Sequence, residues 1–561
     1  MRDPVSHANS IVRRIIESAA KQAQSNGALP AGPLPDFIVE MPSDTSHGDF
    51  AANIALVGAK TFKMSPRAVA EVIVSNIEPH AQFSGVTVAG PGFINFTLSD
   101  KYFSDAVAQI IEDKDKFGHT GYGKNEKVMV EFVSANPTGP MHLGNARGGA
   151  LGDSIASILE AAGYSVTREF YLNDAGNQVE KFGKSLEARY LAIYKADVEF
   201  PEDGYHGGDI TQRAQEFSEM HGDKFVDAAP DERISALVGF ALPRNVEDMK
   251  KVLHNYRVDY DVWFYESSLH KDGTVKKVLD VLTERGAAYE HDGALWYKAT
   301  EFGGDKDEVL VKSNGFYTYF AVDIAYHYNK FVTRGFDKVI NVWGADHHGH
   351  VARMKGALDA LGIGGQRLDV VLMQLVNLVR DGEPVRMSKR TGQAITLTDL
   401  LDEIPVDAAR FFFAFREYSS HFDFDLGLAV KKEKDNPVYY VQYAHARICS
   451  ILRELALKGI DPLAQTQFDF ELLGTEHERA LIRKLSLLPS EIVAAARENE
   501  PARITRYTVD IATAFHKFYQ ECRVMCDDKE LCLARSALCV AVRRVIVNCL
   551  GLLKIDAPEM M

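Results

Sequence analysis

The chain has 561 residues, enough for three or four domains of ~150 residues each. Hydrophobic residues make up 46% and charged residues 25%, which is typical of a folded globular protein and excludes a disordered or fibrous one. The net charge of −15 argues against non-specific DNA binding, and no apolar run reaches the ~18 residues of a membrane span. We therefore expect neither a DNA nor a membrane partner.

Residues 1–118 are predicted to form a small α+β domain. Helical apolar spacing marks residues 11–24, and residues 37–40 are a short strand candidate. Residues 85–98 predict two strands joined at the turn Gly90-Pro91-Gly92.

Residues 119–415 predict an α/β domain built on a parallel sheet. The apolar run at 128–133 is typical of a buried parallel strand, and a Gly/Pro-rich loop joins it to a helix at about 143–162. This order begins a doubly wound, Rossmann-like nucleotide-binding sheet, to which residues 338–344 and 368–375 add two more strands. The charged stretch from about 185 to 300 reads as an insertion, and residues 416–561 predict an all-α bundle.

Two polar loops of the α/β domain carry candidate chemistry. His142-Leu-Gly-Asn145 stands at the start of the first predicted helix, where unpaired N–H groups suit a phosphate. Residues 386–392 place three cations within five residues after an apolar strand, which suits a mobile clamp on a polyphosphate. Taken singly, the first is also typical of an ordinary helix cap and the second of a solvated basic turn.

Together the two loops resemble the paired signatures of class I aminoacyl-tRNA synthetases. Longer stretches narrow the resemblance to the arginyl-tRNA synthetases of bacterial type, and they lie at 130–148, 171–178, 317–327, 343–350, 406–413 and 514–519. Two departures stand out. The family's first signature usually ends in histidine, where this chain has Asn145, and the second keeps Lys389 between arginines at 386 and 390.

The resemblance implies a ligase that activates L-arginine with ATP and passes it to the 3′ end of tRNA(Arg), releasing pyrophosphate and AMP. It implies that residues 1–118 bind the tRNA elbow, 119–415 catalyse, and 416–561 bind the anticodon. It assigns catalysis to His142, Asn145 and Lys389. The other implied ATP contacts are Gly144, Gly344, Asp346, Met387 and Ser388.

Recognition of arginine calls for carboxylates in a fixed fork around the planar guanidinium. Tyr319 and Asp323 are four apart in a predicted helix and share a face, and by resemblance they meet the guanidinium. The resemblance adds Glu131 as a second acid and Asn136 for the head group. The implied arginine contacts are completed by Ser134 and by His347, which replaces a glutamine of some relatives.

For tRNA, an aromatic and basic cluster at the start of the C-terminal helices could stack unpaired bases, with Tyr440, Tyr443 and Arg447 as candidates. Phe93 and Asn95 could do the same for a loop base at the elbow. Core packing is the alternative for both sets. We expect a monomer.

Metal sites have little support in the sequence. Six cysteines, the first at Cys449, are too few for a disulfide scaffold, include no Cys-x-x-Cys pair, and predict a reduced, cytoplasmic protein without structural zinc. Asp346, His347, His348 and His350 could ligate zinc, but they follow a strand of the nucleotide fold. Mg²⁺ is expected with ATP, as part of the substrate complex.

Two alternatives stay open. A class I synthetase for another amino acid would favour neutral residues in place of Glu131 and Asp323, and both acids are present. A non-catalytic tRNA-binding paralogue would have an eroded signature, at which Asn145 hints.

Overall fold

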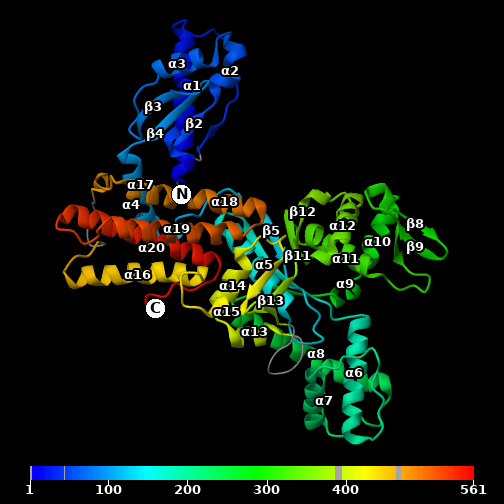
Figure 1. Cartoon of the computed structure of the whole chain (residues 1–561). Coiled ribbons are helices and arrows are strands. Elements are labelled where there is room, and N and C mark those ends of the chain that lie inside the picture. The colour runs from blue at the N-terminus through cyan, green and yellow to red at the C-terminus, as the bar shows by residue number, and fades with distance from the viewer. Residues whose placement is uncertain (1–2, 43, 386–394, 463–468) are drawn as a thin grey trace.

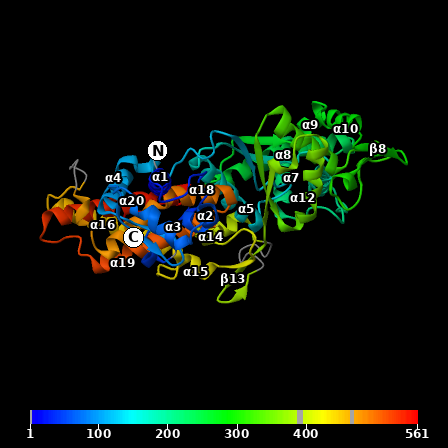
Figure 2. The same cartoon turned by 90° about the horizontal axis from the view of Figure 1, so that it is seen from above.

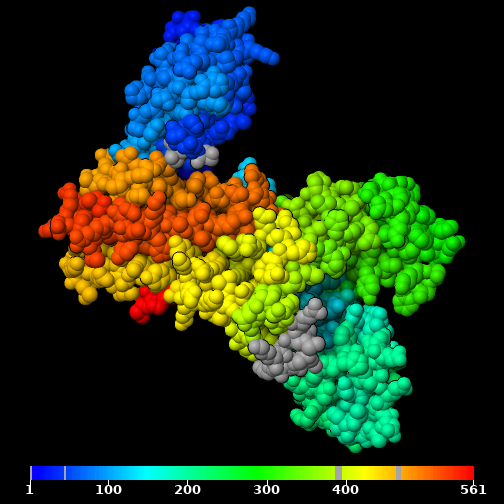
Figure 3. Space-filling view, in the orientation of Figure 1, coloured from blue at the N-terminus to red at the C-terminus, as the bar shows by residue number. Residues whose placement is uncertain are grey.

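The structure is a computed structural model that describes residues 3–42, 44–385, 395–462 and 469–561. An N-terminal α+β unit stands on the C-terminal helices, the parallel sheet lies in the middle, and two appendages project from the far end (Figure 1). From above, the N-terminal unit lies over the C-terminal helices and the appendages lie at the opposite end (Figure 2). The N-terminal unit forms a lobe of its own (Figure 3). The predicted α/β class with an α+β unit before it and a helical bundle after it is confirmed.

The N-terminal unit is a four-stranded antiparallel sheet in the order β1-β2-β4-β3, covered by helices. The predicted hairpin is confirmed as β3 (Phe83–Ala89) and β4 (Phe93–Leu98), which turn through Gly90 at φ +53°. The remaining elements are α1 (Pro4–Ser25), β1 (Val39–Glu40), β2 (Phe50–Ala52), α2 (Ile54–Phe62), α3 (Pro66–Ser75) and α4 (Asp100–Asp113).

The central sheet has five parallel strands in the order β12-β11-β5-β6-β7. The three predicted strands are confirmed as β5 (Lys127–Glu131), β11 (Lys338–Gly344) and β12 (Leu368–Met373), and β6 (Ser165–Leu172) and β7 (Val262–Tyr265) complete the sheet. The predicted helix is α5 (Leu143–Ala161), which lies against the end of β5. A Cβ atom on Gly152 would come within 2.1 Å of the Phe132 side chain, so only glycine permits this close approach.

The stretch 185–300, predicted as one insertion, needs a correction because β7 lies inside it and pairs with β6. The chain therefore leaves the sheet twice. The first appendage, with its own apolar core, is α6 (Asn177–Tyr194), α7 (Gly208–His221) and α8 (Pro230–Asn255). The second comprises α9 (Ser267–Lys271), α10 (Thr274–Glu284), β8 (Ala288–His291), β9 (Ala294–Tyr297) and β10 (Glu308–Val311), and leads to α11 (Tyr319–Tyr328) and α12 (His348–Ala360).

The predicted helical bundle is confirmed as α16 (Pro437–Leu457), α17 (Glu476–Ser486), α18 (Leu488–Glu498), α19 (Ala502–Glu521) and α20 (Lys529–Leu552). It is joined to the sheet through β13 (Val376–Arg380), β14 (Glu383–Pro384), α13 (Leu397–Glu403), α14 (Val406–Phe415), β15 (Phe422–Asp425) and α15 (Leu426–Val430). Buried Asp153 of α5 pairs with Arg410 at 2.6 Å and with Lys554, just after α20, at 2.8 Å. These pairs fasten the end of the bundle to the helix that carries the first signature.

Within the described part of the chain, no helix is long and apolar enough to cross a membrane. The described histidines, cysteines and acids also form no group of three arranged to hold a metal ion. The domain limits at 118 and 415 stay predictions.

Candidate active site

A cleft of about 1030 Å³ opens at the carboxyl ends of β5 and β11. The strand order reverses between these two strands, and ligands of open α/β sheets bind at such switch points. The cleft brings together residues predicted from distant parts of the sequence. They are Ser134, Asn136, His142, Gly144, Asn145, Gly344, Asp346 and His347.

A strained turn directs the chain across this cleft directly after β5. Val133 has φ +72° and Ser134 has φ +44°, and the Ser134 N–H donates to the Phe132 carbonyl at 3.0 Å. A β-branched residue in this region is rare, and such strain gathers at functional sites. No pattern in the sequence indicates this turn.

The first signature caps α5 through its own side chains. The Asn145 Oδ1 accepts from the His142 N–H at 2.9 Å, and the His142 Nδ1 accepts from the Gly144 N–H at 3.2 Å. Asn145 is only 8% exposed. Its side-chain carbonyl caps the start of α5, and the residue also lines the cleft. An asparagine can therefore stand where the family usually has histidine.

The protonation of His142 follows from the same contacts. The cleft walls partly desolvate the ring and lower its pKa, so it is neutral at pH 7. Because Nδ1 accepts a hydrogen bond, the proton sits on Nε2, which can donate to a bound group. A Cβ atom on Gly144 would lie 3.2 Å from the His142 Cε1, so glycine lets the ring fold over the helix start.

The opposite wall of the cleft begins where β11 ends. Gly344 leaves space for the Asp346 carboxylate, since a Cβ atom there would lie 2.4 Å from Oδ1. Asp346 and His347 are paired at 3.6 Å and largely exposed. His350 instead pairs with Asp323, so the Asp/His run spreads apart and does not converge as metal ligands would.

The predicted helix with Tyr319 and Asp323 is confirmed as α11, which Thr318 caps by accepting from the Ala321 N–H. Tyr319 is 61% exposed at its first turn. Asp323 Oδ2 lies 3.2 Å from His350 Nε2. Asp323 does not line the 1030 Å³ cleft, but a series of aromatic side chains connects Asp323 to the cleft wall. Trp343 lies 5.4 Å from the His350 ring and 6.2 Å from the His347 ring.

Glu131, the predicted second acid of the arginine site, already has two side-chain partners in the structure. Its Oε2 accepts from Lys330 Nζ at 2.5 Å, and both side chains are buried. Its Oε1 accepts from the Ser134 hydroxyl at 2.9 Å. The charge of Glu131 is therefore compensated by Lys330, and this carboxylate also holds the turn after β5 through Ser134.

A carboxylate that the sequence analysis missed, Glu266, lies at the end of β7. It is 7% exposed and accepts a hydrogen bond from the Tyr171 hydroxyl. Burial, together with the negative charges of Asp323 and Asp174, raises the pKa of Glu266 to about 7. Among the described residues no ion pair reaches Glu266. No sequence signal marks it, because its position depends on β7, which was hidden in the predicted insertion.

The candidate tRNA residues divide into exposed and buried ones. Tyr443 is 38% exposed and Arg447 lies over its ring at 5.8 Å. The sequence analysis did not single out His516, which stacks on Tyr443 and contacts Tyr440. In the N-terminal unit Phe93 is half-buried. Asn95 is only 6% exposed, which limits its access to a base.

Met387, Ser388 and Lys389 lie outside the described residues, as do the flanking arginines. The chain directly after them is described, and it meets the first signature. Thr396 forms an isolated antiparallel β-bridge with His142, and the Leu397 N–H donates to the Met141 carbonyl at 2.8 Å. Segments separated by about 250 residues in sequence therefore meet beside the cleft.

Comparisons with known proteins cover the whole architecture. Residues 106–413 match the family described as tRNA synthetases class I (R), catalytic domain. The chain belongs to the arginyl-tRNA synthetases. Residues 10–98 match the arginyl tRNA synthetase N-terminal domain and 441–561 the DALR anticodon-binding domain. The predicted resemblance is confirmed.

Relatives of this synthetase share its full length. It is 54% identical to the arginine–tRNA ligase of Caldanaerobacter subterraneus subsp. tengcongensis over 100% of both chains, and 52% identical to that of Ruminiclostridium cellulolyticum over 98% of both. A putative arginyl-tRNA synthetase structure from Campylobacter jejuni is 33% identical, with TM-score 0.76, covering 83% of this chain and 100% of that one. The Thermus thermophilus enzyme, 23% identical with TM-score 0.75, shares the fold over 98% of this chain and 100% of its own.

Proposed function

We propose that this chain activates L-arginine with ATP to arginyl-adenylate and then transfers the arginyl group to the 3′ end of tRNA(Arg). One observation carries the proposal. A cleft at the switch point of the sheet has the first signature on one wall, and Asp323 and Glu266 form an acidic pair outside its lining, connected to it through the rings of His350, Trp343 and His347. Neither step needs a covalent enzyme intermediate, so alignment and charge stabilisation supply the catalysis.

On the ATP side, His142 would donate its Nε2 proton to a phosphate oxygen at the positive end of α5. Asn145 keeps this geometry, and Gly144, Gly344 and Asp346 would line the nucleotide. Lys389, with Met387 and Ser388, would come from the second signature to neutralise the leaving pyrophosphate. Among the described residues that line the cleft, Asp346 is the one carboxylate; it fits Mg²⁺ arriving with ATP, and the ion would offset phosphate charge.

On the arginine side, Asp323 and Glu266 would form the fork that receives the guanidinium, with Tyr319 beside them. Glu266 takes the place predicted for Glu131 because its charge has no cationic partner among the described side chains. Ser134 and Asn136 would hold the head group. His347 stays a candidate contact at the cleft rim.

For tRNA(Arg), the partly exposed cluster of Tyr440, Tyr443, Arg447 and His516 would stack on anticodon bases. Phe93 would contact the elbow, and Asn95, which is 6% exposed, stays a candidate contact on the same strand. We further propose that the protein works in the cytoplasm, because the described cysteines are all free and mostly buried. We also propose that it is a monomer.

The test is amino-acid-dependent exchange of pyrophosphate into ATP, run with each amino acid, with and without tRNA. We expect exchange with arginine that depends on tRNA, as the family resemblance implies. Exchange with another amino acid and not with arginine would support a different class I synthetase. The absence of exchange under every condition would support a non-catalytic tRNA-binding paralogue.

A further inference from the structure

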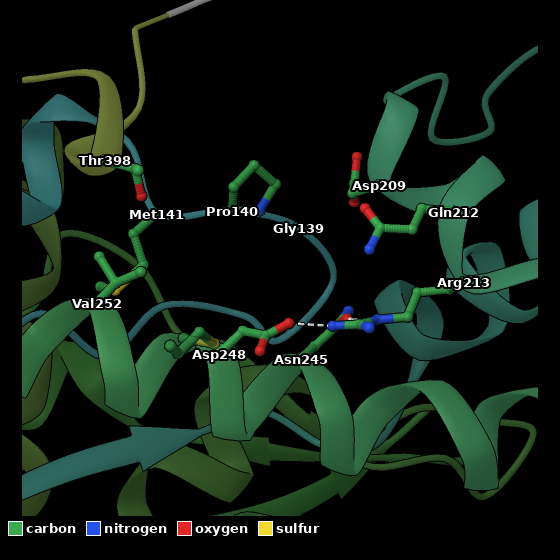
Figure 4. Close-up of a pocket in the computed structure, with 11 residues that line it drawn as sticks. Gly139, Pro140, Met141, Asp209, Gln212, Arg213, Asn245, Asp248, Val252 and Thr398 are labelled. Carbon is green, nitrogen blue, oxygen red and sulfur yellow. Dashed lines mark hydrogen bonds and ion pairs between the residues drawn. The ribbon is translucent and has the colours of Figure 1, made fainter. Parts of the chain in front are cut away.

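Residues 137–141 form a thin wall between two cavities. Gly139, Pro140 and Met141 line the 1030 Å³ cleft on one face and a second cavity of about 210 Å³ on the other. Side chains from α7 and α8 face this wall across the second cavity (Figure 4). The wall leads directly into His142, so its position determines where the proposed phosphate donor lies.

This loop has few means of holding itself in place. Pro137 and Pro140 have no N–H to donate, and Gly139 adds backbone freedom. Two hydrogen bonds tie its ends to other elements. The Leu397 N–H donates to the Met141 carbonyl at 2.8 Å, and the Asn245 Nδ2 of α8 donates to the Pro137 carbonyl at 2.9 Å.

The amide of Asn245 is held in this orientation by Arg213 of α7. Arg213 Nε donates to Asn245 Oδ1 at 2.9 Å, which fixes the oxygen on one side and turns the Nδ2 group toward Pro137. Glu216, at 2.7 Å, and Asp248 hold the guanidinium in turn. Asn245 is 8% exposed, so a lost hydrogen bond there would not be fully replaced by water.

We infer that Asn245, oriented by Arg213, is a positioning residue that sets the loop behind His142 and thereby the affinity for ATP. This inference rests on the proposed function. Without the Asn245 bond, the loop can shift toward the 210 Å³ cavity, and His142 moves with it. The guanidinium end of the arginine site is held separately, by α11 and by the end of β7. Because Asn136 directly precedes Pro137, the shift reaches the arginine head group only in part.

The experiment measures KM for ATP and for arginine by pyrophosphate exchange with the full-length chain and tRNA. Asn245→Ala, and Asn245→Asp, which keeps the acceptor for Arg213 but loses the donor, should raise KM for ATP roughly tenfold. KM for arginine should rise clearly less than KM for ATP, and the melting temperature should hold within a few degrees. Arg213→Met should act in the same direction but less strongly.

A double-mutant cycle separates positioning from general damage. Arg213→Met should add little in the Asn245→Ala background, because Arg213 acts through Asn245. Gln212→Ala is the matched control, since Gln212 lines the same cavity but bonds Glu216 and not the loop. It should leave both KM values unchanged.

An unchanged KM for ATP in Asn245→Ala, an equal rise in both KM values, or additive effects in the cycle would overturn the inference. If the Asn245 variants fail to fold, Arg213→Met and Arg213→Lys decide. An unchanged KM for ATP in both then overturns it. A wild-type chain without arginine-dependent exchange would instead overturn the proposed function, so the two failures are distinguishable.

Discussion

The arginine side of the active cleft is held by a buried network of side chains, whereas the ATP side is a proline-rich loop tied at its ends. On the arginine side, Lys330 bridges Glu131 and Asn341, at 2.5 and 3.1 Å. Asn341 donates to His327 Nε2 at 2.9 Å, and His327 Nδ1 donates to the Asp323 carbonyl at 2.8 Å. Burial holds the pKa of His327 well below its usual range, so the ring stays neutral and this series of hydrogen bonds keeps one donor and acceptor pattern.

The difference fits the demands on each side. Telling a guanidinium from other cations requires carboxylates that do not move, because each misplaced hydrogen bond lowers discrimination. The phosphates of ATP must instead be held while their charge redistributes during the reaction, and a loop between two cavities can adjust to them. We therefore expect variants on the arginine side to affect arginine binding or folding, and variants on the ATP side to affect ATP binding or the activation rate.

The largest effect should come from breaking the buried pair. Glu131→Gln leaves the Lys330 ammonium buried without its counter-charge and should lower the free energy of unfolding by about 3–5 kcal/mol. Urea denaturation followed by circular dichroism measures this. Glu131→Gln combined with Lys330→Met should recover much of the loss. A loss below about 1 kcal/mol in the single variant would mean that water reaches Lys330.

Asp323→Asn comes next, and it probes the fork directly. Removing one carboxylate leaves the guanidinium poorly paired in a half-buried site, which should raise KM for arginine by ~10²–10³-fold. KM for ATP should change little. Pyrophosphate exchange at varied arginine gives the result, and a retained arginine affinity would show that the pocket is elsewhere.

Lys389→Ala tests the expected effect on rate at the ATP side. If Lys389 acts mainly as the phosphates reorganise, the activation rate should fall ~10²-fold while KM for arginine stays unchanged. Single-turnover formation of the adenylate separates rate from binding. An unaltered rate would indicate that the arginines at 386 and 390 carry the charge.

The smallest predicted effect is a pH dependence of arginine binding. Because the pKa of Glu266 is raised to about 7, its charged form is lost as the pH falls below 7, and with it one partner of the guanidinium. KM for arginine should therefore decrease roughly tenfold between pH 6 and pH 8. Glu266→Gln is the control. A slope that survives in this variant would assign the titration to another group.

The sequence predicted the sheet well where apolar runs were long. The strands β5, β11 and β12 each carry a nearly continuous apolar stretch, and the loop and helix after β5 follow standard signals. The strand β7 was missed because it has only four residues, Val262–Tyr265, within a charged stretch. Because β7 was not predicted, Glu266 was missed as well. Glu266 comes close to Asp323 only when the sheet assembles.

The site shows the same limit. Family resemblance located His142 and Asp323, but the pairing of Glu131 with Lys330 joins residues about 200 positions apart, which no local pattern reveals. The positive φ of Val133 is equally hidden, because a β-branched residue has no local preference for that conformation. Spacing predicts elements, whereas charge compensation depends on tertiary contacts.

A crystal structure with a non-hydrolysable analogue of arginyl-adenylate would show both ends of the proposed site at once. We expect the phosphate-like group of the analogue at His142 Nε2 and its guanidinium between Asp323 and Glu266. A guanidinium bound at Glu131 after displacement of Lys330, or an adenylate seated away from His142, would contradict this expectation.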